Sequence, residues 1–416
     1  MKLVTIAWRN LGRNRKRSLL SLSAIAVAAL SITLLFALLT GMAEELADNL
    51  INHYNGEVRI RHAEYGEYER FNPLHLRIRD AETLVSRLAG TAGVAAVSPR
   101  ISFPGAVLRD ERSFGLRGLG LDFALEGRYQ NLETLLVAGV LPEETGREGR
   151  RVNAAVGTGV AQRLGLEVGD TFTLLASTMS RGTNAMSFEV TGVLDFPVGG
   201  LNAQTFIAPL DAVQRLLRMD SSVTEILLKG EGNLSASQLA EIATTVVARR
   251  EEGSELSVEP WTEIRSTYNV IEIARVTYGF IALVFFLLGS TVIMNTVMMA
   301  VFERREEIGT LAALGMEEKE IVRLFFLETL IMSAIGSFSG VILGVAIALP
   351  LEQVGIDLSQ AMQGVSMEVS DIIYPQVDLF TTVVVFLAST LVATAASYLP
   401  ARSAAKIDPV EALRGE

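Results

Sequence analysis

Four long apolar blocks that contain no Asp, Glu, Lys, Arg or His constrain this chain more than any other feature of its sequence. They are 26, 27, 23 and 23 residues long, and a helix needs about 20 residues to cross the hydrocarbon core of a bilayer. Charged residues make up only 20% of the 416 residues, and the mean hydropathy is +0.36. Each block is therefore predicted to span a membrane, which excludes a soluble protein. The blocks are Ser18–Ala43, Val276–Phe302, Thr329–Leu351 and Leu379–Ala401.

The charges of the segments between the blocks predict one orientation, because short cytoplasmic loops carry an excess of Lys and Arg. Residues 1–17 hold six cations and no acid, residues 303–328 hold four cations, and residues 352–378 hold five acids and no cation. Both termini and the 303–328 loop are therefore expected in the cytoplasm, and segment 42–275 outside. A cleaved signal peptide is the alternative for the first block, but this block is roughly twice as long as a typical signal-peptide apolar region.

The composition also excludes several kinds of chemistry. Residues 42–275 hold 23 Lys and Arg against 32 Asp and Glu, and this net charge of −9 argues against binding nucleic acid. Without cysteine the chain has no disulfide, thiol chemistry or cysteine-zinc site. The three histidines, His53, His62 and His75, could form a metal site with Glu57 or Glu64, but ordinary surface positions are the favoured interpretation.

No nucleotide-binding or hydrolase motif is present. The sequence has no Gly-Lys pair and hence no phosphate-binding loop, and no Gly-x-Ser-x-Gly or His-Glu-x-x-His pattern. We therefore expect no catalytic residue, no metal and no cofactor on this chain, and an energy source outside it.

The large segment between the first two blocks is predicted to be a mixed α+β domain, with two lobes as one arrangement. Alternating residues predict a strand over Gly56–His62, and Asp80–Leu88 has the N-cap residue and spacing of a helix. Val94–Leu125 is predicted to form short strands interrupted by Pro99, Pro104, Gly115, Gly118 and Gly120. The remaining predicted elements are helices at Thr158–Leu164, Leu210–Arg218 and Ser235–Arg250 and strands at Thr171–Leu175, Ser187–Leu194, Thr205–Ala208 and Thr224–Lys229.

Two features concern the membrane helices themselves. Gly336, Gly340 and Gly344 recur every four residues, and small residues one turn apart let helices approach closely in lipid. Trp261–Arg275 has helical spacing and leads directly into the second block, which predicts a helix that projects from the bilayer as a stalk. A tilted helix that ends at the interface is the alternative.

The loop that follows the second block predicts a short docking helix. Charged residues come first, an apolar strip follows, and Gly315 is the expected end of the helix. A second helical run, Glu317–Leu327, leads into the third block. Such a helix suits a groove on a partner protein, and an interfacial helix on lipid headgroups is the alternative. The strip consists of Ile308, Leu311, Ala312 and Leu314.

Four motifs resemble those of the ABC-transporter permease family that includes the lipoprotein-releasing (Lol) permeases, the MacB exporter and the division protein FtsX. The loop carries Glu303-Arg304-x-x-Glu307-Ile308-Gly309-x-Leu311-x-Ala313-Leu314-Gly315-Met316, and the C-terminal part carries Pro400-Ala401-x-x-Ala404-Ala405-x-x-Asp408-Pro409-x-Glu411-Ala412-Leu413-Arg414. Ala7-Trp8-Arg9-Asn10-Leu11-x-Arg13-Asn14-x-x-Arg17 resembles the family's entry helix. Gly157-x-x-Val160-Ala161-x-x-Leu164-Gly165-Leu166-x-Val168-Gly169-Asp170 resembles its core-domain motif.

The resemblance implies a multi-pass permease of the bacterial inner membrane that works by mechanotransmission. A separate cytoplasmic ABC ATPase would bind ATP and Mg, and each permease would pair with a second copy or a paralogue. The resemblance assigns ATPase coupling to Glu303, Arg304, Glu307, Ile308, Gly309, Leu311, Leu314 and Gly315, and a cytoplasmic tail motif to Pro400, Asp408, Pro409, Leu413 and Arg414.

The strand Gly56-Glu-Val-x-Ile-Arg-His62 and the separate-subunit organisation are most similar to the lipoprotein-releasing group. The leading hypothesis is extraction of lipoproteins, with the small-residue faces of the first and third spans bordering an acyl-chain entrance and a periplasmic carrier or adaptor as a further partner. Export of a peptide, antibiotic or other amphiphile and FtsX-like signalling to a cell-wall hydrolase are the alternatives.

The predicted segments are an entry helix at 1–17, spans at 18–41, 271–302 (with the stalk), 329–351 and 379–401, a MacB-like periplasmic domain at 42–270, a coupling loop at 303–328, a periplasmic loop at 352–378 and a cytoplasmic tail at 402–416.

Overall fold

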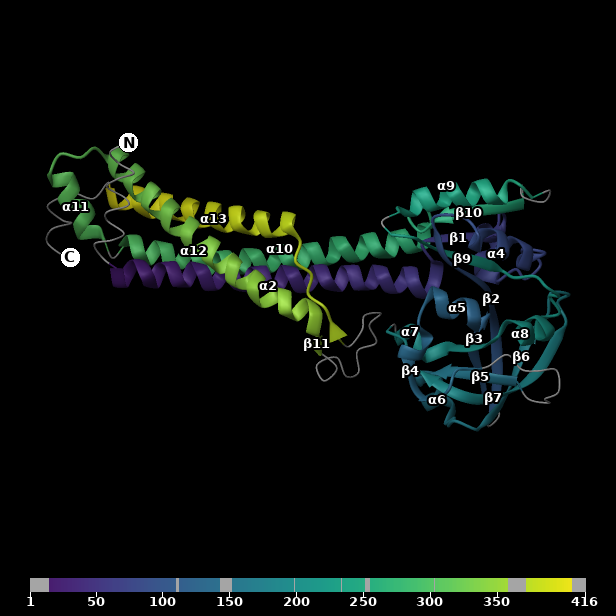
Figure 1. Cartoon of the computed structure of the whole chain (residues 1–416). Helices are drawn as coiled ribbons and strands as arrows, with labels where there is room; N and C mark the ends of the chain where they lie inside the picture. The colour runs from purple at the N-terminus through teal and green to yellow at the C-terminus, as the bar shows by residue number, and fades with distance from the viewer. Residues whose placement is uncertain are drawn as a thin grey trace. The chain divides into compact units, whose positions relative to one another are not determined.

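The computed structural model describes residues 15–109, 112–142, 152–197, 199–232, 234–250, 255–302, 304–357 and 372–405. The chain divides into two compact units (Figure 1). The first contains the four apolar blocks and is called the membrane unit. The second consists mainly of Glu45–Glu272 and is called the outer unit.

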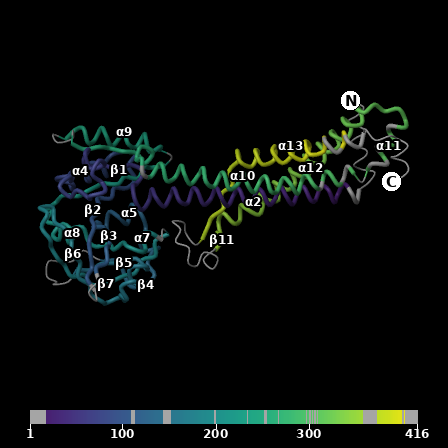
Figure 2. Tube along the Cα trace, turned by 180° about the vertical axis from the view of Figure 1, so that it is seen from behind, coloured from purple at the N-terminus to yellow at the C-terminus, as the bar shows by residue number. Residues whose placement is uncertain are grey.

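Four long helices account for the four apolar blocks. Each contains a stretch long and apolar enough to cross a membrane, so the predicted four membrane helices with an α+β domain between the first two are confirmed. Figure 2 shows the four helices running alongside one another in the membrane unit. They are α2 (Arg15–Leu50), α10 (Arg265–Phe302), α12 (Glu318–Val354) and α13 (Leu379–Ala405).

A short loop segment packs onto the backbone of α2. After the two-stranded pair β11 (Ile356–Asp357) and β12 (Ile372–Ile373), the N–H of Gln376 donates to the carbonyl of Ala37 at 2.9 Å. A Cβ on Gly41 would lie 2.1 Å from the carbonyl oxygen of Tyr374, so only glycine allows this contact. The segment before α13 is thereby attached to the first membrane helix.

Within the described residues, ten strands of the outer unit form one sheet, and six of them close on themselves. Successive pairings run β2–β3–β8–β5–β7–β6 and return from β6 to β2. The strands β9, β1 and β10 extend the sheet from the first half of β2, and β4 pairs with β7. The bounds are β1 Val58–His62, β2 Val94–Arg109, β3 Arg112–Leu121, β4 Leu136–Gly139, β5 Val152–Gly157, β6 Thr171–Ser177, β7 Thr183–Leu194, β8 Thr205–Pro209, β9 Glu225–Gly230 and β10 Leu256–Pro260.

Short helices cover this sheet and connect its strands. Ser235 caps the N-terminus of α9 with a reciprocal bond to Gln238, as a Ser-x-x-Gln pattern favours. The helices are α3 Tyr65–Tyr68, α4 Ala81–Ala89, α5 Phe123–Tyr129, α6 Thr158–Leu164, α7 Gly199–Gln204, α8 Leu210–Leu217 and α9 Ala236–Val247, with 3-10 turns η2 at Glu69–Phe71 and η3 at Leu132–Leu135 and a π-turn η1 at Ile51–Asn55.

Four buried phenylalanines fill the closed part of the sheet. Phe172 and Phe188 are stacked with ring centroids 5.7 Å apart, and Phe103 and Phe206 meet the group edge-on. A Cβ on Gly118 would lie 2.4 Å from the Phe103 ring. Position 118 therefore requires glycine, because a side chain there would collide with the Phe103 ring.

Three predictions about the outer unit are wrong in detail. Val94–Leu125 is not a set of short strands, because β2 and β3 form one long hairpin. Pro104 is tolerated because β2 pairs with β3 alone between its contacts with β9 and β6. The helix predicted from Trp261 begins at Arg265, since residues 261–263 form a turn. Asp80 precedes α4, but its side chain makes no capping bond.

Candidate functional site

The segment after α10 forms a short helix that ends at a glycine, as predicted. Helix α11 covers Arg305–Ala313. The N–H of Leu314 donates to the carbonyl of Thr310 at 3.0 Å, and the N–H of Met316 donates to that of Leu311 at 3.2 Å. Gly315 has a φ of +88°, the left-handed conformation that closes a helix in this way.

Arg304 ties this loop to the third membrane helix. Its Nε donates to Glu307 at 2.7 Å, its Nη1 pairs with Glu328 of α12, and its guanidinium carbon lies 4.7 Å from the centre of the Phe325 ring. The Glu328 side chain is 5% exposed. Burial alone would lower the pKa of Arg304, but the two carboxylates outweigh it and raise the pKa, so the cation is stabilised.

The predicted coupling residues lie at different depths. Gly309 is buried, Leu311 is half-buried and Leu314 is 79% exposed, while α11 packs against α12 and α13. Leu314 thus presents an apolar side chain beside an anchored helix. Some predicted residues lie outside the part of the chain that the structure describes. These are Glu303, Asp408, Pro409, Leu413 and Arg414. For Ile308 and Pro400 only the backbone is described, in α11 and α13 respectively.

The three glycines of the third span lie against the first span of the same chain. A Cβ on Gly340 would lie 2.2 Å from the carbonyl oxygen of Ala26, and one on Gly344 would lie 2.9 Å from Cβ of Thr33. Gly336 has a similar relation to Leu22, at 3.1 Å. The predicted close packing of these glycines against another helix is therefore confirmed, and the glycine face of α12 is covered by α2. That the small-residue faces border an acyl-chain entrance stays a prediction.

We expect Gly340→Leu to separate α12 from α2, because no side chain fits against the Ala26 carbonyl. The detergent-solubilised variant should unfold at a lower temperature and yield less intact complex than the unsubstituted chain. Gly279→Leu is the matched control, since a Cβ at Gly279 has no neighbouring atom within 4 Å. Equal effects of both substitutions would contradict the packing role of Gly340.

A cavity of about 270 Å³ in the membrane unit is lined by residues of α2, α10 and α13. Phe36, Leu39 and Ala282 give it apolar walls, and an ion pair of 3.1 Å between Arg275 and Glu44 lies among its lining residues. Apolar walls beside a charged pair suit a molecule with an acyl part and a polar part.

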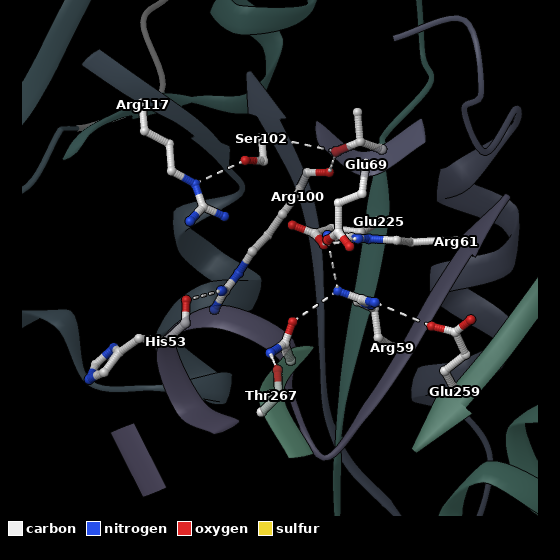
Figure 3. A network of polar contacts seen from close by, with 12 residues as sticks. His53, Arg59, Arg61, Glu69, Arg100, Ser102, Arg117, Glu225, Glu259 and Thr267 are labelled. Carbon is white, nitrogen blue, oxygen red and sulfur yellow. Dashed lines mark hydrogen bonds and ion pairs between the residues drawn. The ribbon is translucent and has the colours of Figure 1, made fainter. Parts of the chain in front are cut away.

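A buried network of polar side chains lies in the outer unit (Figure 3). Arg61 of β1 pairs with Glu225 of β9 and at 2.6 Å with Glu69, and Arg59 pairs at 3.2 Å with Glu259 of β10. Burial alone would raise the pKa of Glu225, but Arg61 and Arg59 hold it below its ordinary value. The arginines of the Gly56–His62 strand thus serve to connect three neighbouring strands.

Among the ion pairs of the described residues, the pair that Arg100 of β2 forms is the most deeply buried. Arg100 meets Glu126 of α5 at 2.6 Å, with side chains 2% and 0% exposed, and also donates to the carbonyl oxygen of His53 at 3.2 Å. Burial and the nearby Arg100 charge lower the pKa of His53 to about 4. His53 is therefore neutral near pH 7.

Removing one partner of this pair should destabilise the outer unit strongly. Glu126→Ala leaves the Arg100 charge buried without its carboxylate, which typically costs about 3–5 kcal/mol, and should lower the thermal unfolding transition of the purified full chain. The control is Asp211→Ala, which breaks an exposed pair with Arg215 and should cost at most about 1 kcal/mol. A transition unchanged by Glu126→Ala would contradict the role of the pair.

The histidines do not come together as a metal site. His53 is half-buried beside Phe196, whereas His62 lies 3.9 Å from Glu255. Within the described part of the chain, no group of three or more His, Asp or Glu side chains is placed to hold a metal ion.

Sequence reasoning missed two sets of residues. Glu328 falls within the predicted loop, although a carboxylate directly beside an apolar block signals a charge that needs a partner. Asn55 and Thr267 give no such signal, because neutral polar residues at helix ends carry no pattern that predicts their pairing across 212 positions.

Comparison with known proteins agrees with this architecture. Residues 18–246 match the MacB-like periplasmic core domain, and residues 279–409 match the FtsX-like permease C-terminal family. The lipoprotein-releasing system transmembrane protein LolC of Xylella fastidiosa is 27% identical over 97% of this chain and 96% of its own. An uncharacterized ABC transporter permease of Methanocaldococcus jannaschii is 24% identical over 100% and 98%.

A third relative is similar over a shorter stretch. The macrolide export ATP-binding/permease protein MacB of Bradyrhizobium diazoefficiens is 27% identical over 55% of this chain and 33% of that longer protein.

Fold and comparisons together define a four-helix membrane permease with a MacB-like periplasmic domain inserted between its first two helices. The chain belongs to the MacB/LolC family of ABC transporter permeases.

Proposed function

We propose that this chain is a permease subunit that converts ATP hydrolysis by a separate cytoplasmic ABC ATPase into motion of its outer unit. It works as a dimer with a second copy or a paralogue in the bacterial inner membrane, with both termini in the cytoplasm and the outer unit in the periplasm. ATP and Mg bind to the ATPase, and the chain itself is not an enzyme. The charges of the short loops support this orientation.

The attachment of α11 to the third membrane helix carries this proposal. A force applied to the exposed Leu314 side of α11 reaches α12 through Arg304, which binds Glu307 and Glu328. A loosely attached loop would absorb such a force, whereas a charge-assisted pair beside the membrane transmits it.

The cargo we propose is a lipoprotein taken from the inner membrane. The end-to-end similarity to a lipoprotein-releasing transmembrane protein supports this choice, and the cavity beside Phe36 and the Arg275–Glu44 pair is suited to an acylated molecule. The similarity to a macrolide exporter favours export of another amphiphile as the second candidate.

Loosening the loop should uncouple the two activities. The double substitution Glu307→Gln with Gly315→Ala removes one Arg304 contact and strains the left-handed helix end. We expect normal membrane insertion and continued ATP hydrolysis. The release of a triacylated lipopeptide from proteoliposomes should fall by roughly tenfold, which is within the range that substitutions along a coupled network of residues produce. Lys319→Gln, an exposed change in the first turn of α12, is the control. Full release by the double variant would refute the docking role.

Depleting the permease in cells should retain acylated proteins in the inner membrane. Fractionation of membranes followed by detection of triacylated proteins measures this effect. If lipoprotein sorting is unchanged and the cells become more sensitive to a macrolide, lipoprotein release is refuted and export of another amphiphile is supported.

A further inference from the structure

The first and second membrane helices are hydrogen-bonded to each other inside the outer unit. Helix α2 continues through the π-turn η1, which ends at Asn55, and α10 begins at Arg265. The side-chain amide nitrogen of Asn55 donates to the hydroxyl of Thr267, and the two residues are 8% and 4% exposed. Breaking a hydrogen bond between buried groups leaves both without partners, which is costly.

The other end of the same amide binds the sheet. Asn55 Oδ1 accepts from Nη1 of Arg59 at 2.9 Å, and Arg59 also pairs with Glu259 of β10. Figure 3 shows this chain of contacts from Thr267 to Glu259. One asparagine therefore connects α10, η1 and two strands, with both ends of its amide in use.

The backbone around Asn55 is also held in place. The N–H of Gly56 donates to the carbonyl of Ile51 at 2.7 Å, and Gly56 has a φ of +71°, where a Cβ would meet Leu227 at 3.0 Å. The carbonyl of His53, within the same turn, accepts from Arg100. A π-turn shifts the direction of the residues that follow it and often marks a functional position in a helix.

We propose that Asn55, Thr267 and Arg59 form a clamp that stays closed throughout the ATPase cycle. The strands β1 and β10 then move with the ends of the two helices as one rigid body, and Asn55 is a positioning residue. This inference deepens the proposed function and rests on it. A hinge at the same place, opening when ATP binds, is the competing possibility.

The absence of native cysteine makes a distance measurement direct. Cysteines replacing the exposed residues Glu241 on α9 and Glu272 on α10 carry nitroxide labels in the full chain, reconstituted with its ATPase in nanodiscs. Pulsed electron resonance then reports their distance without nucleotide, with ATP trapped by vanadate, and with ADP. A closed clamp predicts the same narrow distribution in all three states; a shift of its maximum with nucleotide overturns the proposal.

Substitutions test which residues keep the distribution narrow. Asn55→Ala should broaden it and lower release of the triacylated lipopeptide by roughly 3- to 30-fold, the range of changes along a coupling network, with ATP hydrolysis retained. Thr267→Ser keeps the hydroxyl and should behave as the unsubstituted chain. Asn49→Ala is the matched control, because Asn49 is also 8% exposed on α2 and, in the described part of the chain, its amide nitrogen has no hydrogen-bond partner.

The outcomes separate this inference from the proposed function. If Asn55→Ala leaves both distribution and release unchanged, or if Asn49→Ala has the same effect, the clamp is refuted. If the unsubstituted chain neither binds an ATPase nor releases the lipopeptide, the proposed function fails, whereas the distance distribution of Asn55→Ala still tests the clamp.

Discussion

The cost of placing charge in hydrocarbon organises the membrane unit. Among the described residues, its ion pairs lie just outside the apolar blocks. Glu44, directly after the first block, pairs with Arg275, directly before the second. Arg304, two residues after the second block, pairs with Glu328, directly before the third. The second membrane helix is thus bracketed by charge at both ends of its apolar block. The first pair joins one end of the second block to α2, and the second pair joins the other end to α12. The cost of burying charge in lipid thus keeps charged residues out of the spans and places them where they pair neighbouring helices.

Where charge is excluded, small side chains take over the packing. Gly336, Gly340 and Gly344 bring α12 against α2 at distances that exclude any Cβ at the central position. Between α12 and α13 buried hydroxyl groups also meet, with Ser333 and Thr394 3.1 Å apart, beside the edge-on rings of Phe338 and Phe386. Lipid supplies little hydrophobic drive for helix association, so close contact and hydrogen bonds must supply it.

The parts of the fold that depend on local periodicity could be predicted from the sequence, and those that depend on distant partners could not. The membrane helices follow from runs of apolar residues, and the end of α11 at Gly315 follows from a glycine after an apolar strip. The sequence predicts short strands in place of the β2 and β3 hairpin because Pro and Gly, here Pro104 and Gly118, normally interrupt strands. This prediction is wrong. Their tolerance comes from a missing neighbour strand and from the Phe103 ring, and both are properties of the assembled sheet.

The same distinction applies to the candidate site. Arg304 and Glu307 belong to a recognisable motif, but Glu328 joins them only because α12 folds back beside α11. The outer unit repeats this pattern with the arginines of β1, whose alternation predicted a strand but not partners on β9 and β10. Since a buried charge must be paired wherever the chain places it, arginines in an otherwise apolar strand are themselves a signal. They indicate that acidic residues far along the sequence lie next to that strand, although the sequence alone does not say which ones.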